Sequence, residues 1–240
     1  MNTRYIRLLP VLFLFTLVGC GKSSEQKTAT VGPTVIEWET LNEEVKNLYK
    51  KGDYDRAVVI AKKALDIAEE NSGSSHLHVA TSLNNLAAIY QAQGKYAKVE
   101  PLLKRALVIN EKALGPEHPG VATSLNNLAL LYHIQGKYAK VEPLYKRALA
   151  INDEALGPGH PQVATSLNNL AALYNAQGKY NEAEPLYKRA LAIDDQALGP
   201  DHPSVATGLN NLGLLYRATD RQAEAEKLEK RAAAIEAKPR

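Results

Sequence analysis

Apolar residues recur at helical spacing through most of this chain, and short polar breaks divide them into helix-sized segments. Between His118 and Gly136 one apolar stripe contains Val121, Leu125, Leu128, Ala129 and Tyr132. Spacings of three and four residues place such side chains on one side of an α-helix. Pro119 suits a first helical position, and Gly136 suits the residue that closes a helix. The pattern therefore predicts an amphipathic helix between these two residues.

A second stripe predicts a second helix, from about Tyr138 to Gly157-Pro158. Its inward positions are Val141, Leu144, Tyr145, Ala148, Leu149 and Ile151. Pro143 falls near the start of this helix, where a proline removes few backbone hydrogen bonds. Glu142 precedes Lys146 by one turn, the favourable order for an ion pair on an exposed helix side. Equivalent pairs are Glu100/Lys104, Glu184/Lys188 and Glu226/Lys230.

This two-helix unit repeats with a fixed period of 42 residues, as from His118 to His160. The pair Asn-Asn recurs at Asn84/Asn85, Asn126/Asn127, Asn168/Asn169 and Asn210/Asn211, and Gly-Lys-Tyr recurs at Gly94, Gly136 and Gly178. Such a period is typical of stacked repeats, in which each unit buries its apolar side against its neighbours. We therefore predict an all-α solenoid of about five helix pairs over residues 36–237. The expected repeats are 37–70, 79–112, 121–154, 163–196 and 205–237.

The unit resembles the tetratricopeptide repeat, whose signature is W-x2-L-G-x2-Y, then A-x3-F, with a later proline. One unit matches it through Leu125, Leu128, Ala129, Tyr132, Val141, Tyr145 and Ala148, and the next through Leu167, Leu170, Ala171, Tyr174, Ala183, Tyr187 and Ala190. The period departs from the usual 34 residues, because the connection between units is longer. That longer form is similar to the repeats of kinesin light chains and their bacterial relatives. The resemblance implies a right-handed α-solenoid whose first helices line a concave surface.

The first and last repeats are more polar than the middle ones. Glu44 stands where later repeats place leucine, and Glu229 replaces an inward tyrosine. Thr219-Asp220-Arg221 replaces the Gln-Gly-Lys turn. End repeats face water on one side, so this erosion is expected of the two ends of a solenoid.

The N-terminus has the layout of an export signal. Arg4 and Arg7 precede an apolar run from Leu8 to Val18, which is shorter than a membrane-spanning helix requires. Leu17-Val18-Gly19-Cys20 resembles the lipobox of bacterial lipoproteins, which implies a signal peptide at 1–19 and a lipid on Cys20. The alternative is an ordinary signal peptide with an incidental cysteine. Residues 20–35 would form a flexible tether, because this segment is rich in Gly, Ser, Thr and Pro.

Removal of the signal changes the charge argument. The whole chain has 29 basic and 26 acidic residues and a net charge of +3, and the segment 1–19 contributes two arginines and no acid. The mature chain would carry a net charge of about +1, which gives no case for nucleic-acid binding. Cys20 is the single cysteine of the chain, so no intramolecular disulfide can form.

The residues do not single out a catalytic or metal site. His76, His118, His160 and His202 fall one per repeat, so stacking would place them in a row and not around one centre. We expect each His-Pro or equivalent pair to shape the entry to a first helix. Gly-Lys pairs lack the other residues of a phosphate loop. The sequence therefore predicts no cofactor, no metal and no enzyme.

The candidate binding surface is the side of each first helix that lies opposite its apolar stripe. At 100° per residue this side carries Thr123, Asn126, Asn127, Leu130 and Ile134. Asparagine offers donors and acceptors that suit the backbone of an extended peptide. One asparagine of each pair is expected to be a satisfied internal amide, and we assign the groove to the first. The predicted groove residues are Asn84, Asn126, Asn168, Asn210, Thr81, Thr123, Thr165 and Thr207.

One position near the end of each first helix varies between repeats, as Gln91, His133, Asn175 and Arg217. A variable lining position favours selectivity in a groove, and drift at a solvated edge explains it equally well. The Lys-Arg pairs of the second helices are interpreted as a solvated side.

Together these features predict a lipid-anchored adaptor or assembly scaffold that binds a protein or peptide partner. Its expected location is the bacterial cell envelope, at the outer membrane facing the periplasm, and its expected state is a monomeric solenoid. The alternative is a scaffold that self-associates through its ends and binds no peptide.

Overall fold

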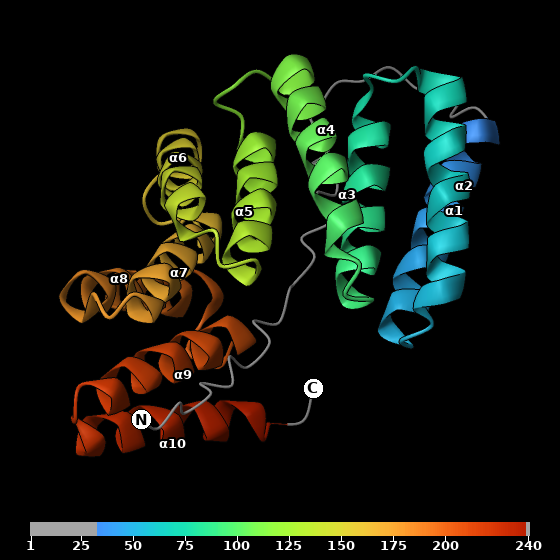
Figure 1. The fold of residues 1–240 in the computed structure, drawn as a ribbon. Helices are drawn as coiled ribbons and strands as arrows, with labels where there is room; N and C mark the ends of the chain where they lie inside the picture. The colour runs from blue at the N-terminus through green and yellow to red at the C-terminus, as the bar shows by residue number, and fades with distance from the viewer. Residues whose placement is uncertain (1–32, 239–240) are drawn as a thin grey trace. The chain divides into compact units, whose positions relative to one another are not determined.

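The computed structural model describes residues 33–238, all of whose regular structure is helical (Figure 1). Residues 1–32 and 239–240 are outside this description, so the predicted signal peptide, Cys20 and most of the predicted tether lie outside it. The helices are α1 (Pro33–Lys50), α2 (Tyr54–Ser72), α3 (Leu77–Ala92), α4 (Tyr96–Leu114), α5 (Pro119–Ile134), α6 (Tyr138–Leu156), α7 (Pro161–Ala176), α8 (Tyr180–Leu198), α9 (Pro203–Ala218) and α10 (Gln222–Glu236).

Five helix pairs follow one another, as the 42-residue period predicts. Odd-numbered helices are the first helices of the five repeats, and even-numbered helices are the second. Helix α1 begins at Pro33, inside the segment predicted to be a tether. Proline lacks a backbone donor but fits the first turn of a helix. The proline-containing composition of segment 20–35 therefore suggested a loop at a position where a helix begins. Pro143 lies inside α6, which continues unbroken to Leu156.

Each first helix is buried over a wider arc than its apolar stripe predicts. The stripe from Val121 to Tyr132 is buried, but Ala122, Ser124 and Leu131 of α5 are buried as well. The reason is that α5 packs against α6 of its own repeat and also against α4 of the preceding repeat. A helix that packs against two others exposes only a narrow strip of its surface to solvent.

The first helices form the inner layer of the stack. Successive first helices approach one another at α1–α3, α5–α7 and α7–α9, whereas no two second helices do so among the described residues. Small buried residues such as Ala57 and Ala148 stand on the second helices where they meet the first. This arrangement agrees with the expectation that the first helices carry the candidate binding surface.

A histidine immediately precedes four of the five first helices, at the N-cap position. Nδ1 of His118 accepts a hydrogen bond of 3.0 Å from the backbone N–H of Gly120, at the helix end where donors lack intrahelical partners. The same bond is made by His76, His160 and His202, over 3.1–3.2 Å. The prediction that these histidines shape the entry to each first helix is confirmed. No group of three or more metal-ligating side chains occurs among residues 33–238.

Turns between paired helices require a residue with positive φ. Gly136 has a φ of 70°, a conformation that glycine adopts without steric cost. In the last repeat Asp220 takes this place, with a φ of 58°. Aspartate tolerates this region better than most residues, so the turn survives the loss of glycine.

Both ends of the stack lack a leucine that packs between repeats in the middle. Leu107, Leu149 and Leu191 each pack under the first helix of the following repeat, but the equivalent residue at the C-terminal end is the exposed Ala233. At the other end Glu44 stands where Leu86 and its equivalents are buried. At these two positions neither end carries the leucine that packs between repeats in the middle of the stack.

Candidate functional site

The four predicted threonines lie on the open side of the first helices. Each hydroxyl donates to the backbone carbonyl four residues earlier, over 3.1–3.2 Å. Thr165 and Thr207 are exposed, and Thr81 and Thr123 are half-buried. A hydroxyl that donates to its own helix keeps its acceptor sites, so the threonine row can still accept from a ligand.

The first asparagine of each pair is turned toward the interior in three repeats. Nδ2 of Asn126 lies 3.4 Å from Oγ of Ser166 on α7, the first helix of the next repeat. The Oδ1 atoms of Asn84, Asn126 and Asn168 are buried and have no hydrogen-bond partner among the described residues. Asn210, in the last repeat, instead donates to Glu236 over 3.1 Å. These three carbonyl oxygens are therefore closed to a ligand in this conformation.

In the last three repeats the two asparagines differ in the surroundings of their amides and not in their overall burial, because both are half-buried. Asn127, Asn169 and Asn211 are half-exposed, and none makes a hydrogen bond within residues 33–238. Asn85 differs, because it is buried and donates to Oδ1 of Asn42 over 2.7 Å. The geometry thus moves the candidate groove amide from the first to the second asparagine. In the third repeat the neighbouring first helix accounts for this difference, because Asn126 lies against Ser166 of α7.

Apolar side chains interrupt this polar row. Ile134 of α5 and Leu214 of α9 are each 44% exposed, although both are large and aliphatic. Alanines take their places on the alternate first helices, as Ala92 on α3 and Ala172 on α7. The inner side from α3 to α9 therefore alternates bulky and small apolar positions beside threonine and asparagine.

The variable position is accessible to different degrees in the four repeats. His133 packs edge-to-face on Tyr138, with 5.4 Å between ring centroids, and burial lowers its pKa below the usual 6.5. Asn175 has a buried, unpartnered Oδ1, and Gln91 is half-buried. Arg217 donates twice to Glu229 of its own repeat, over 2.6 and 2.5 Å. Arg217 is thus already paired, and the four residues do not form one equivalent lining.

Two open hollows lie away from this surface. One is lined by Thr40, Glu43, Glu44, Asn47 and their neighbours at the first repeat. The other lies between α6 and the turn after α7, at Tyr138, Pro143, Lys146 and Gln177. Both are shallow surface features, and neither includes a predicted groove residue.

A second recurring polar cluster links the second repeat to the third, the third to the fourth and the fourth to the fifth, and only part of it was predictable from the sequence. The predicted pairs Glu100/Lys104, Glu142/Lys146 and Glu184/Lys188 form, with Nζ–O distances of 2.7–2.8 Å. The hydroxyls of Tyr132, Tyr174 and Tyr216 also donate to these glutamates, over 3.0–3.1 Å. The fourth predicted pair, Glu226/Lys230, is not formed, and Glu226 accepts from Gln222 instead.

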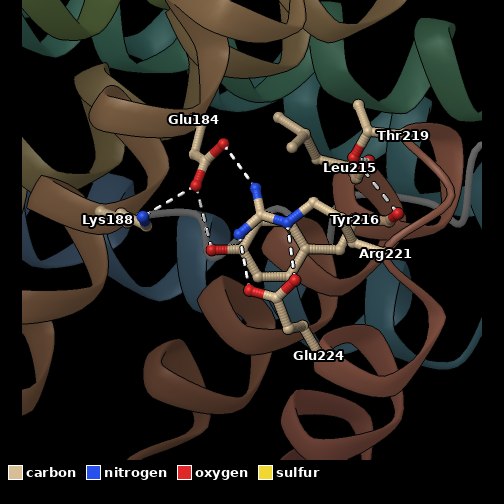
Figure 2. A network of polar contacts seen from close by, with 7 residues as sticks. All are labelled: Glu184, Lys188, Leu215, Tyr216, Thr219, Arg221 and Glu224. Atoms are coloured by element: carbon tan, nitrogen blue, oxygen red, sulfur yellow. Dashed lines mark hydrogen bonds and ion pairs between the residues drawn. The ribbon is translucent and has the colours of Figure 1, made fainter.

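The last of these clusters is the most extensive (Figure 2). Arg221 stacks on the ring of Tyr216 at 3.7 Å, donates to Glu184 over 2.8 Å, and pairs with Glu224 through two bonds of 2.6 and 2.7 Å. Arginine can do this because its planar guanidinium combines stacking with several donors. The lysines of the earlier turns approach their tyrosines less closely, at 5.5 Å for Lys137 over Tyr132.

The clusters make repeat stacking sensitive to acid. The Lys104 ammonium, aided by the Tyr132 hydroxyl, lowers the pKa of Glu100 from 4.5 to about 2. A lowered carboxyl pKa contributes stability above the unfolded value, and this stability is lost as pH falls toward 2. We expect Tyr132→Phe to reduce the free energy of unfolding by about 1 kcal/mol at pH 7. Urea melts at pH 7 and pH 3 should show a smaller acid loss in the variant, and an unchanged loss would contradict this role.

Comparison with known proteins identifies the repeat. A family model for the tetratricopeptide repeat matches at residues 40–111, 78–154, 138–196 and 162–236. The chain belongs to the tetratricopeptide-repeat family. A search of curated proteins found no match.

Solved structures agree with this assignment of fold. The putative kinesin light chain TPR-like repeats of Podosopora anserina are 28% identical, with 83% of this chain and 94% of that chain covered and a TM-score of 0.68. BtubC (BKLC) from P. vanneervenii is 27% identical, with 86% and 84% covered and a TM-score of 0.72. Pseudomonas aeruginosa pilF, at 17% identity over 87% and 80% of the two chains and a TM-score of 0.61, is similar in fold.

The family result sets the general function. Tetratricopeptide repeats generally mediate protein–protein interaction, and their function lies in the surface that each protein presents. In this chain, none of the helices within residues 33–238 is both long and apolar enough to cross a membrane.

Proposed function

We propose that this protein is a lipid-anchored, non-enzymatic adaptor of the bacterial cell envelope that binds an extended segment of a partner protein. The main observation behind this proposal is a row of half-exposed asparagines whose amides make no hydrogen bond within the described structure. These residues are Asn127, Asn169 and Asn211. Each amide offers two donors and one acceptor, which match the backbone groups of an extended segment. The binding surface runs along the inner layer from α3 to α9.

The exposed apolar residues support the same surface. Ile134 and Leu214 leave aliphatic area in water, and the alanines on α3 and α7 leave room for bulky side chains of a ligand. The inner sides of α3, α5 and α7 carry no Asp, Glu, Lys or Arg. An uncharged segment with apolar side chains is therefore the favoured ligand class, because it leaves no buried charge unpaired.

The loss of packing residues at both ends favours this adaptor over the self-associating scaffold. Glu44 at one end and Ala233 at the other replace residues that pack between repeats in the middle of the stack. End-to-end assembly would bury Glu44 without the apolar contacts that hold internal junctions together. We therefore propose that the solenoid is monomeric, and sedimentation that shifts with protein concentration would contradict this.

Site-specific photo-crosslinking in cells tests the binding surface. A photoreactive residue at position 127 or 169 should capture a defined partner band. The matched control is position 108, where Val108 is 61% exposed on the second helix α4. Capture confined to the inner positions supports the proposal, whereas equal capture at position 108 would mean that the inner side has no special role.

The membrane anchor rests on the Leu17-Val18-Gly19-Cys20 pattern and has its own test. A thioether-linked lipid on Cys20 would make membrane association depend on this one residue. We expect Cys20→Ala to abolish incorporation of an alkyne-labelled fatty acid and to leave the chain unprocessed or soluble. Cys20→Ser, which keeps the size of the side chain, should behave in the same way. Labelling of either variant would refute the anchor.

A further inference from the structure

Buried polar pairs connect the repeats beneath the inner layer. Between the second and third repeats, Nδ2 of Asn110 donates to Oγ of Ser124 over 2.8 Å. Between the third and fourth, Nδ2 of Asn152 donates to Oγ of Ser166 over 3.0 Å and approaches the carbonyl oxygen of Gln162 at 3.4 Å. These asparagines and serines are all buried. Each amide thus donates across a junction that water does not reach.

The junction between the fourth and fifth repeats departs from this design. The equivalent residues there are Asp194 and Gly208. Asp194 is 4% exposed, and no hydrogen bond or ion pair to it occurs among the described residues. A carboxylate can only accept hydrogen bonds, and glycine provides no hydroxyl to donate one. The position equivalent to Gln162 is Ser204, whose backbone carbonyl is also an acceptor and not a donor.

Protonation would restore the missing donor. A protonated carboxyl carries one O–H, which can donate to the backbone carbonyl of Ser204, the counterpart of the Gln162 carbonyl that Asn152 approaches in the preceding junction. Burial raises the pKa of Asp194 from 3.8 to about 6. The α8–α9 junction is also the least extensive of the four contacts between repeats. A junction with few other contacts responds most to the charge of one buried group.

We propose that Asp194 and Gly208 form a pH-sensitive joint between the fourth and fifth repeats. Protonated Asp194 holds the α9–α10 pair against α8, and ionised Asp194 loosens it. The fifth repeat carries Thr207, Asn211 and Leu214 of the inner surface, so the joint changes how that end of the surface is presented. This inference does not depend on the proposed function, because it concerns only the docking of the last repeat.

Other ionisable groups on the packed elements are engaged elsewhere. On α7, Tyr174 bonds to Glu142, and on α9, Tyr216 and Arg217 bond to Glu184 and Glu229. His202 accepts a hydrogen bond from the backbone N–H of Ser204, at the start of α9.

Charged groups of α8 and α10 are paired as well. On α8, Lys188 pairs with Glu184, Arg189 with Asp153, and the neighbouring Asp195 with Arg231 of α10. On α10, Glu236 accepts from Asn210. Among the described residues, no cation faces Asp194 to hold its carboxylate.

The direction of the pH effect separates this joint from the glutamate clusters. A raised pKa gives stability that is fully present below pH 3.8 and is lost as pH rises through about 6. The lowered pKa of Glu100 instead costs stability only below 4.5. The pKa of Asp194 differs between the docked and the undocked state. This difference predicts that the equilibrium constant for docking of the last repeat falls by about tenfold between pH 5 and pH 7.5.

Hydrogen exchange of the α9–α10 amides, normalised to intrinsic rates at each pH, measures this docking. In the wild-type chain we expect protection about tenfold higher at pH 5 than at pH 7.5. Asp194→Asn with Gly208→Ser restores the pair found at the two preceding junctions, so the protection of this variant should not fall between these pH values. The variant keeps every histidine of the wild-type chain, so other pH-dependent contributions are common to both chains and cancel in this comparison.

The preceding junction provides a matched control. Asn152→Asp with Ser166→Gly should create the same pH dependence there and should extend it to α7 and α8. The proposal is overturned if wild-type protection is equal at the two pH values, or if the Asp194→Asn, Gly208→Ser variant keeps the tenfold change. It is also overturned if the transplanted pair at positions 152 and 166 leaves α7–α10 insensitive to pH.

Discussion

Leu128→Ala is expected to lower the free energy of unfolding by about 2–5 kcal/mol, the range found when a large core side chain is truncated. Leu128 is 5% exposed and belongs to the largest core cluster, which joins residues of several repeats. Truncation leaves a cavity that packed neighbours fill only in part. Urea melts followed by circular dichroism would measure the loss.

The effect should spread beyond the third repeat. In a solenoid each repeat is stabilised by its neighbours, so a weakened α5 loosens the junctions on both of its sides. Ile134→Ala on the same helix is the matched control, because Ile134 is 44% exposed, and its cost should be about 0.5 kcal/mol or less. Equal losses in the two variants would show that the buried stripe is assigned to the wrong side of the helix.

The sequence alone was sufficient for the repeat and its helices, because each helix depends on local signals. Pro119 and Gly136 mark helix ends through backbone geometry that is independent of distant residues. The stripe through Leu125 and Tyr132 has a period that only a helix satisfies. Repetition strengthens these signals, since the same pattern recurs at a fixed interval.

The contacts between repeats could not be read from the sequence in the same way. Tyr132 and Glu100 lie 32 residues apart, and only the stacking of α5 on α4 brings them within 3.0 Å. The pair Glu142/Lys146 was predictable because both residues lie on one helix. Glu226/Lys230 has the same spacing but does not form, and the last repeat has no following tyrosine to complete such a cluster.

The choice between the two asparagines also depends on contacts between helices. Helical geometry places Asn126 and Asn127 100° apart, but it does not say which neighbouring helix covers which of them. Packing of α5 against its neighbours decides this, and Asn126 is the one that meets Ser166. The sequence shows that aspartate occupies position 194, where the two preceding repeats have asparagine. The consequence for docking follows only from the buried hydrogen bond that Asn152 makes in the preceding junction.

Replacement of Asn127 and Asn169 together by alanine is expected to weaken partner binding at least about tenfold. Each lost set of hydrogen bonds to a ligand backbone costs about 1–3 kcal/mol, and 1.4 kcal/mol corresponds to a factor of ten. Both asparagines are half-exposed and make no hydrogen bond within the described structure, so the melting midpoint should change little. The titrant is a synthetic peptide with the sequence of the segment captured by photo-crosslinking at position 127.

Asn126→Ala with Asn168→Ala is the matched variant, because it removes the same two amides one residue earlier on the same helices. We expect it to bind the peptide normally, since the Oδ1 atoms of Asn126 and Asn168 are buried. Its stability should also change little, because loss of the 3.4 Å contact with Ser166 is offset by removal of two unpaired buried oxygens. The reverse binding pattern would return the groove to the first asparagine, and normal binding by both variants would remove the asparagine row from the recognition surface.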